Sequence, residues 1–286
     1  MKCKVEKSKI TGQIICPSNK SYTHRAIFLA SLAGNNSKVD NALLSADTAA
    51  TIDACKKFGA VIKTQNSTII AENPIKLDVN VPEINTENSG TTIRIASGIA
   101  SLFSNEITLT GDVSLQKRPM QPLLDALESI GAQCDSTDGK PPIKIKGKIL
   151  GGNVSIPGNL SSQFVSALLI SAPLTEKGIN LTIEGNLVSK PYLDATIATM
   201  RKFGVTVQTL IPYKKYNITP QIYKSATFTV PIDFSSLGLL LSAVVLNGED
   251  VIIKGNLGDL PQGDEVFLDI LEQLGVSVTI NDDEIK

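Results

Sequence analysis

The stretch Pro17 to Leu32 carries two cations and a hydroxyl where an apolar helix is expected to begin. Lys20 is followed by Ser21, and Arg25 directly precedes the apolar run 26–29. A proline and a serine ahead of such a run predict a helix start, which presents free backbone N–H groups and the positive end of the helix dipole. Together with an ammonium, a guanidinium and a hydroxyl, these groups predict an anion site. A solvated helix start with incidental charges is the alternative.

A repeated pattern shows which elements must position these residues. Four segments consist of a polar helix start, an apolar helix, a glycine and a strand, and their glycines are separated by 72, 73 and 71 residues: Gly59, Gly131, Gly204 and Gly275. Each glycine stands where a left-handed helix C-cap is expected. A more apolar helix precedes each segment, over residues 23–33, 91–103, 162–174 and 236–246. We predict four copies of one unit of about 72 residues, made of strand, buried helix, strand, second helix and one or two strands.

Copies of one unit place the starts of their buried helices on a common side of a domain. The starts in units two and three, Asn88–Thr91 and Ser161–Gln163, carry several hydroxyls, and Gly90 would let backbone N–H groups approach a ligand closely. Ser, Thr and Asn at a helix start are most often simple caps. Asp47 and Asp264 are interpreted as such caps, and His24 as a packed side chain.

Two further helix starts carry a cation directly before a proline. They are Arg118-Pro119 and Lys190-Pro191, which we expect at the same relative position, the start of the second helix, in units two and three. A cation at a helix N-terminus opposes the helix dipole, so its repetition suggests a function. Arg94, inside a buried helix, could form either a structural ion pair or a ligand contact.

Length and composition exclude several classes of protein. With 286 residues, of which 42% are hydrophobic and 19% charged, the chain is long enough for two domains. A net charge of −1 gives no general attraction to nucleic acid or anionic membrane, and no apolar stretch is long enough to cross a bilayer. Four scattered cysteines predict reduced thiols in a cytoplasmic protein, and a single histidine excludes multi-histidine metal sites.

Six motifs in order carry a resemblance to a known family. They are Lys20-Ser-x-x-x-Arg25, Asn88-Ser-Gly-Thr91, Lys117-Arg-Pro119, Ser161-Ser-Gln-Phe164, Ser189-Lys-Pro-Tyr192 and Gln262-Gly-Asp264. With them the chain resembles the 5-enolpyruvylshikimate-3-phosphate (EPSP) synthases over its whole length. The resemblance implies an α+β fold of repeated βαβαββ units around a pseudo-threefold axis. This is the two-domain inside-out α/β barrel of the enolpyruvyl transferases, with the active site between the domains.

The resemblance also implies a reaction. The enolpyruvyl group of phosphoenolpyruvate is transferred to the 5-hydroxyl of shikimate 3-phosphate and phosphate is released, in the shikimate pathway to chorismate and the aromatic amino acids. Two anions must be held side by side while positive charge develops at C2 of the enol. The family implies no metal or organic cofactor, no nucleic acid or membrane partner, a cytoplasmic location and a monomer.

Matched position by position, the resemblance implies roles for the residues on the shikimate 3-phosphate side. Lys20 would lie between the substrates, touch both and assist proton transfer, so it is the candidate catalytic residue. Ser21 and Arg25 would bind the carboxylate end of shikimate 3-phosphate. Its 3-phosphate would be bound by three serines: Ser161, Ser162 and Ser189.

The resemblance implies a second group of residues for phosphoenolpyruvate. Gly90 and Arg118 would bind this substrate, Arg118 through its charge, and Gln163 would contact both ligands. Four more residues are candidates for the wall of the site or for ligand contacts: Asn88, Thr91, Arg94 and Tyr192.

The chain departs from the family in the number of units. The family has six units, and its later ones carry the catalytic aspartate, a Lys-Glu pair and further cations of the phosphoenolpyruvate site. Four units predict a complete three-unit domain over residues 15–227 and a partial second domain from residues 1–14 and 228–286. Such an apparently C-terminally truncated chain would keep much of the shikimate 3-phosphate site and would not turn over unaided. Its fourth unit would expose apolar surface from residues 236–246.

Two alternatives stay open. The enolpyruvyl transferase that acts on UDP-N-acetylglucosamine shares the fold and chemistry, but its first lysine is usually followed by Asn, where this chain has Ser21. It also typically carries a reactive cysteine before the Arg-Pro pair, and residues 111–118 contain none. The other alternative is a non-catalytic module that binds small anions.

Overall fold

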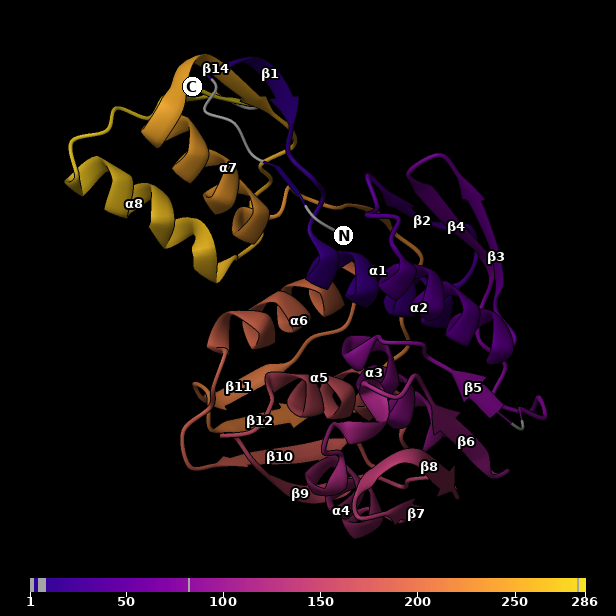
Figure 1. Ribbon diagram of the computed structural model, residues 1–286. Helices are drawn as coiled ribbons and strands as arrows, with labels where there is room; N and C mark the ends of the chain where they lie inside the picture. The colour runs from indigo at the N-terminus through magenta and orange to yellow at the C-terminus, as the bar shows by residue number, and fades with distance from the viewer. Residues whose placement is uncertain (1–2, 5–8, 82, 282) are drawn as a thin grey trace.

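Four similar sheets, each with two helices, make up the computed structural model, which describes residues 3–4, 9–81, 83–281 and 283–286 (Figure 1). In each sheet the first strand of a unit pairs parallel with the second, and the last two strands add an antiparallel hairpin. The sheet orders are β13-β2-β4-β3, β5-β6-β8-β7, β9-β10-β12-β11 and β1-β14-β16-β15. The predicted α+β fold of βαβαββ units is confirmed.

The elements of the four units occur in the same sequence. Unit one contains α1 (Lys20–Ala33), β2 (Ser37–Asp40), α2 (Ala46–Lys57), β3 (Val61–Gln65) and β4 (Thr68–Asn73). Unit two contains β5 (Glu83–Asn85), α3 (Gly90–Ala100), β6 (Ile107–Thr110), α4 (Gln121–Ser129), β7 (Gln133–Thr137) and β8 (Lys140–Lys146). Unit three contains β9 (Gly152–Pro157), α5 (Ser162–Ser171), β10 (Ile179–Glu184), α6 (Lys190–Lys202), β11 (Gln208–Ile211) and β12 (Lys215–Ile218). Unit four contains α7 (Phe234–Asn247), β14 (Gly248–Lys254), α8 (Val266–Gln273), β15 (Ile280–Asn281) and β16 (Glu284–Ile285).

The first strands of units one and four have exchanged places in the sequence, so that each lies next to one unit in the chain and pairs in the sheet of the other. Strand β1 (Ile10–Ile15) precedes α1 but pairs with β14 of unit four, and β13 (Thr227–Thr229) follows unit three but pairs with β2 of unit one. The chain therefore passes twice between unit four and the three other units. The two passages run side by side, because Asn19 N donates to Pro231 O at 2.8 Å and Asp233 N donates to Pro17 O at 2.8 Å.

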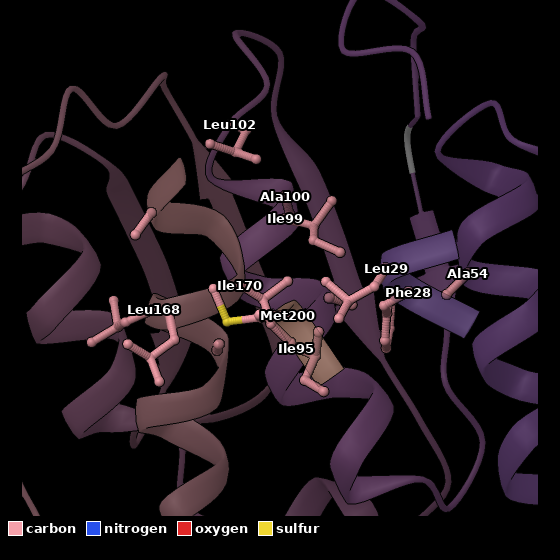
Figure 2. Close-up of a cluster of buried hydrophobic side chains, with 14 of the residues drawn as sticks. Phe28, Leu29, Ala54, Ile95, Ile99, Ala100, Leu102, Leu168, Ile170 and Met200 are labelled. Carbon is pink, nitrogen blue, oxygen red and sulfur yellow. The ribbon is translucent and has the colours of Figure 1, made fainter. Parts of the chain in front are cut away.

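The first helices of units one to three are buried because they are apolar on nearly all sides. Figure 2 shows side chains of α1, α3 and α5 meeting in one cluster, among them Phe28, Ile95 and Leu168. Helices α3 and α5 touch along their backbones, since a Cβ added at Gly98 would lie 2.6 Å from the carbonyl oxygen of Ala167. This close approach places the starts of the buried helices near one another.

Helix α7 has the same apolar character but lies mostly exposed. Leu239 and Leu246 are 76% and 78% exposed, and a small second core contains only part of its apolar residues. Figure 1 shows unit four set to one side of units one to three. The predicted exposure of apolar surface from residues 236–246 is confirmed.

In the described part of the chain, the helices are too short or too polar to span a bilayer.

The backbone contact at Gly98 predicts a position-specific effect of a single methyl group. Gly98→Ala should destabilise the protein by about 2 kcal/mol, because the added Cβ meets a backbone carbonyl that cannot move aside. Gly238→Ala, in the equivalent helix α7, is the matched control, since its nearest neighbour is Phe267 at 3.6 Å. The control should be neutral or stabilising by up to about 1 kcal/mol. Urea unfolding followed by circular dichroism measures both, and equal effects would contradict the packing described.

Candidate functional site

The start of α1 is fixed by an asparagine that also contacts unit four. The side chain of Asn19 accepts from Tyr22 N at 2.8 Å and so caps the helix. Its amide nitrogen donates to Asp233 Oδ1 at 3.1 Å and to Gln262 Oε1 at 2.6 Å. Because Asp233 in turn caps α7, the starts of α1 and α7 are hydrogen-bonded to each other directly beside Lys20.

Lys20 points to a carboxylate that sequence reasoning assigned to another role. Its Nζ lies 3.0 Å from Asp47 Oδ2, and the two side chains are 51% and 32% exposed. The prediction that Asp47 caps α2 is wrong, because Ser45 is the N-cap and forms a capping box with Thr48. An exposed pair of this kind contributes less than about 1 kcal/mol to stability, so it leaves the ammonium available to an anion.

The prediction that Asp264 caps a helix is also wrong. Helix α8 begins two residues later and has no side-chain cap. Asp264 lies in a 3-10 turn (Gly263–Glu265) and its carboxylate accepts from Ser235 Oγ at the start of α7. The cap prediction failed because the turn inserts between the acidic residue and the helix.

A cavity of about 500 Å³ lies between the starts of α1 and α6 and unit four. The α1 side contributes Lys20 and Ser21, and the α6 side contributes Ser189 and Tyr192. Unit four closes the cavity opposite them with polar residues: Asp233, Ser235, Gln262 and Asp264. Four predicted site residues are therefore brought together at one cavity.

Ser189 is placed by an unusual backbone conformation. Its φ is +55°, in the left-handed region, and its hydroxyl makes no cap bond to the helix that it precedes. The hydroxyl is therefore free to bind a ligand.

The two cations expected at equivalent helix starts lie at different positions. Lys190 is the first residue of α6, and its Nζ lies 5.1 Å from the centroid of the Tyr213 ring. Arg118 lies three residues before α4. The predicted equivalence of these two cations is wrong.

Two arginines converge on the start of α3. A Cβ added at Gly90 would lie 2.5 Å from Arg118 Nη1 and 3.6 Å from Arg94 Nη1. Arg118 Nη2 donates to Asn88 Oδ1 at 2.8 Å. Burial, with a further contribution from the charge of Arg118, lowers the pKa of Arg94 to about 10, so the guanidinium of Arg94 stays charged at neutral pH. Adjacent like charges at a helix N-terminus favour a bound anion.

Gln163 joins this cluster to α5. Its Nε2 donates to Thr91 Oγ1 at 3.0 Å, and its Oε1 accepts from Arg94 Nη1. Arg94 also lies over the ring of Phe164, 5.2 Å from the centroid. Among the residues that the structure describes, Arg94 contacts an amide and an aromatic ring and pairs with no carboxylate, which favours a ligand contact over a structural ion pair.

The remaining serines of the predicted phosphate site lie at the start of α5. Ser161 caps the helix by accepting from Gln163 N at 3.2 Å, and Ser162 is buried in the first turn. Neither serine lines the 500 Å³ cavity. The structure therefore divides the predicted site into residues around that cavity and a cluster at the starts of α3 and α5.

Arg25 lies beneath the cavity and is 1% exposed. Its Nε donates to Thr196 Oγ1 at 2.7 Å, its Nη1 to Ser21 O at 2.9 Å and its Nη2 to Tyr192 O at 3.1 Å. Burial lowers the pKa of Arg25 to about 10, so the guanidinium remains charged. Its assigned contact with a substrate carboxylate stays a prediction.

Sequence reasoning missed Asn19 and Asp233 and gave Asp47 a different role. Their roles depend on which helices meet in the fold. The spacing of residues along the sequence does not predict that the start of α1 contacts α2 and the start of α7. Gln262 stood in one of the six motifs, so the resemblance did point to it. His24 packs inside the protein as expected, 1% exposed, with Nδ1 2.6 Å from Thr51 Oγ1.

Comparison with known proteins gives a consistent result. The family model described as EPSP synthase (3-phosphoshikimate 1-carboxyvinyltransferase) matches residues 5–286. A 3-phosphoshikimate 1-carboxyvinyltransferase of Nitrosopumilus maritimus (strain SCM1) is 82% identical over the whole chain, which covers 68% of that relative. One from Methanosphaera stadtmanae is 40% identical, with the whole chain covering 69% of it.

Solved structures show the same fold. EPSP synthase from Acinetobacter baumannii aligns with a TM-score of 0.82 at 25% identity, covering 97% of this chain and 64% of that one. The enolpyruvyl transferase NikO from Streptomyces tendae aligns with a TM-score of 0.70 at 16% identity, covering 97% and 65%, and shares the fold. The chain thus spans about two thirds of the length of the proteins that it matches.

Burial of the single histidine predicts a pH-dependent stability. Burial lowers the pKa of His24 from 6.5 to about 3. Between these two pH values the histidine is protonated in the unfolded chain and neutral in the folded protein. This stability is full above pH 6.5 and is lost as pH falls toward 3. Between pH 7.5 and 5.5 the free energy of unfolding should drop by about 1 kcal/mol more in the wild type than in His24→Asn.

Urea unfolding at the two pH values measures this difference. Burial raises the pKa of Asp233 and Glu265, so protonation of these two groups at low pH favours the folded state. The effect of His24 is therefore taken as the difference in pH dependence between the wild type and His24→Asn. Identical pH dependence in the two proteins would rule out a buried neutral His24.

Proposed function

The chain belongs to the EPSP synthase family, and from this premise we propose that it binds shikimate 3-phosphate in the cavity between α1, α6 and unit four. The reaction that it serves is enolpyruvyl transfer from phosphoenolpyruvate to the 5-hydroxyl of that substrate. The 5-hydroxyl loses its proton as its oxygen bonds to C2 of the enol, and C3 gains a proton. The resulting tetrahedral intermediate then loses phosphate from C2 and a proton from C3, which restores the C2–C3 double bond. This is the transferase reaction named by the matching family.

The observation that carries the proposal is the arrangement of Lys20, Ser21 and Ser189 around one cavity. Ser189 supplies a hydroxyl that its own helix does not use, at a helix start that favours a phosphate. Lys20 supplies an ammonium whose exposed partner, Asp47, can share it with an anion. In this proposal Lys20 lies between the substrates and moves a proton in the transfer.

The second substrate is placed at the neighbouring cluster. Arg118, Arg94 and the backbone N–H groups beginning at Gly90 offer two charges and a helix start to the phosphate or carboxylate of phosphoenolpyruvate. Gln163, at the start of α5 in unit three, bonds to Thr91 and Arg94 of unit two and is positioned to contact either ligand. The Ser161 and Ser162 assignments to the 3-phosphate stay part of this proposal.

The domain division is proposed together with the function. Residues 15–227 would form the shikimate 3-phosphate domain, and residues 1–14 with 228–286 would form one unit of a second domain. Four units are two thirds of six, in agreement with the 68% of the Nitrosopumilus maritimus relative that the chain covers. The exposed apolar face of α7 is the surface on which further units would pack. A monomeric state and a cytoplasmic location are proposed on family grounds.

Isothermal titration calorimetry with shikimate 3-phosphate tests the binding step. Lys20→Met and Ser189→Ala should each weaken binding at least tenfold, because each removes a direct contact with an anionic group. Lys56→Met, in the last turn of α2 and away from the cavity, is the matched control and should bind like the wild type. A wild-type protein that shows no binding would contradict the proposal.

A coupled phosphate-release assay tests turnover by the same chain. We expect binding without sustained turnover, because the family's later units supply the carboxylates and cations that complete the reaction. Sustained turnover that disappears in Lys20→Met would contradict that expectation and establish a complete site. Binding of sulfate or inorganic phosphate with the affinity of shikimate 3-phosphate would instead favour a general anion-binding module.

A further inference from the structure

Two adjacent residues of α1 contact equivalent threonines in two different units. His24 Nδ1 lies 2.6 Å from Thr51 Oγ1 in α2, and Arg25 Nε lies 2.7 Å from Thr196 Oγ1 in α6. Thr51 and Thr196 are 145 residues apart, the same separation as the helix-ending Gly59 and Gly204. They therefore occupy the same place in units one and three, and α1 lies between them.

On the His24 side, hydroxyls continue the contact to the start of α3. Thr51 Oγ1 lies 2.6 Å from Thr92 Oγ1, which lies 2.6 Å from Ser89 Oγ. Ser89 is the N-cap of α3, and it and both threonines are at most 1% exposed. Three short hydrogen bonds thus connect α1 to the residue directly before Gly90.

The neutral ring of His24 favours one order of the protons in this series, although the carbonyl oxygen of Asp47 is a second, longer acceptor for Thr51 at 3.4 Å and Thr92 at 3.5 Å. Each hydroxyl carries a single proton, and the ring of His24 is neutral at pH 7 because burial lowers its pKa to about 3. If Ser89 donated toward the ring, Nε2 would carry a buried proton, and this atom has no partner within the described part of the chain. If Nδ1–H donates to Thr51, Nε2 is left as a buried acceptor instead of a buried donor, and Ser89 keeps its proton for an acceptor at the start of α3.

On the Arg25 side, a matching series leads to the start of α5. A guanidinium can only donate, so Arg25 Nε–H points to Thr196. Thr196 Oγ1 lies 2.8 Å from Ser166 Oγ and also 2.8 Å from the carbonyl oxygen of Tyr192. Ser166 Oγ donates to the carbonyl oxygen of Ser162 at 3.1 Å and accepts a longer bond of 3.4 Å from Arg25 Nη2. Ser162 is the first residue of α5. Each series therefore begins at an N–H of α1, passes through the equivalent threonine and ends at the start of a neighbouring buried helix.

We propose that Thr51 and Thr196 are positioning residues that separately set the starts of α3 and α5 relative to α1. Both threonines are fully buried and touch neither the 500 Å³ cavity nor the arginine cluster. Because hydrogen bonds in a water-free interior are directional, a hydroxyl series fixes helix register more tightly than apolar packing alone. In this proposal Thr51 positions the start of α3, where Gly90 and Arg118 lie. Thr196 positions the start of α5, where Ser161 and Ser162 lie.

This inference rests on the proposed function only in naming the ligands. With those assignments, Thr51→Val should weaken phosphoenolpyruvate binding about tenfold and leave shikimate 3-phosphate binding unchanged. Thr196→Val should weaken shikimate 3-phosphate binding about tenfold and phosphoenolpyruvate binding less, because, of the residues at the start of α5, only Gln163 is proposed to contact phosphoenolpyruvate. A purely structural loss of stability would weaken both ligands together in both variants.

Amide hydrogen exchange tests the positioning without any ligand. In Thr51→Val the amides of residues 92 and 93 should exchange at least tenfold faster, while those of residues 163 and 164 keep wild-type rates. Thr196→Val should show the opposite pattern. Thr51→Ser and Thr196→Ser keep the hydroxyl and should restore wild-type exchange, because valine and serine differ in the hydrogen bond that this proposal requires.

The outcomes separate the two proposals. If the wild type binds neither ligand, the proposed function fails, and the exchange pattern still decides the positioning role. Equal acceleration at both helix starts, no acceleration at either, or no recovery in the serine variants would overturn the positioning role. If a valine variant does not fold, Thr92→Val and Ser166→Ala interrupt the same two series one residue further along and carry the same expected exchange patterns.

Discussion

The close packing of α3 against α5 is the constraint on which the rest of this structure depends. Gly98 lets the two backbones approach until a methyl group would collide with a carbonyl oxygen, and α1 completes the cluster with side chains such as Phe28 and Leu29. Because the units are copies, this packing also brings the polar starts of the three helices together. Burial of an apolar core and assembly of a polar site are thus consequences of one geometric repeat.

The polar starts are not equivalent once assembled. Around Lys20 and Ser189 they face a cavity closed by acidic and uncharged polar residues of unit four. Around Gly90, two arginines meet without a carboxylate among the contacts described. The first arrangement suits a ligand that carries both hydroxyls and a phosphate. The second suits a small, highly charged anion. The repeat supplies similar scaffolds, and local substitutions make them chemically different.

The fold was predictable from the sequence because it repeats. The glycine spacing of 71 to 73 residues and the apolar first helices were enough to infer the unit, and the motifs supplied the candidate residues. What could not be predicted depends on contacts between units. The spacing of Asp47 suggested a cap, but Ser45 two residues earlier takes that role and Asp47 pairs with Lys20. Arg25 was expected at an anion site, and its burial in the core beside Thr196 could not be inferred from its position in the sequence.

The exchanged strands β1 and β13 have a consequence for synthesis on the ribosome. Unit one cannot complete its sheet until residues 227–229 have been made, about 150 residues after its own last strand. Units two and three contain all their strands in one continuous segment, so they can close first. Sequence-distant pairing slows folding because the intervening loop must be ordered before the contact is made. The first segment to emerge therefore waits, with α1 exposed, for a strand that is encoded after units two and three.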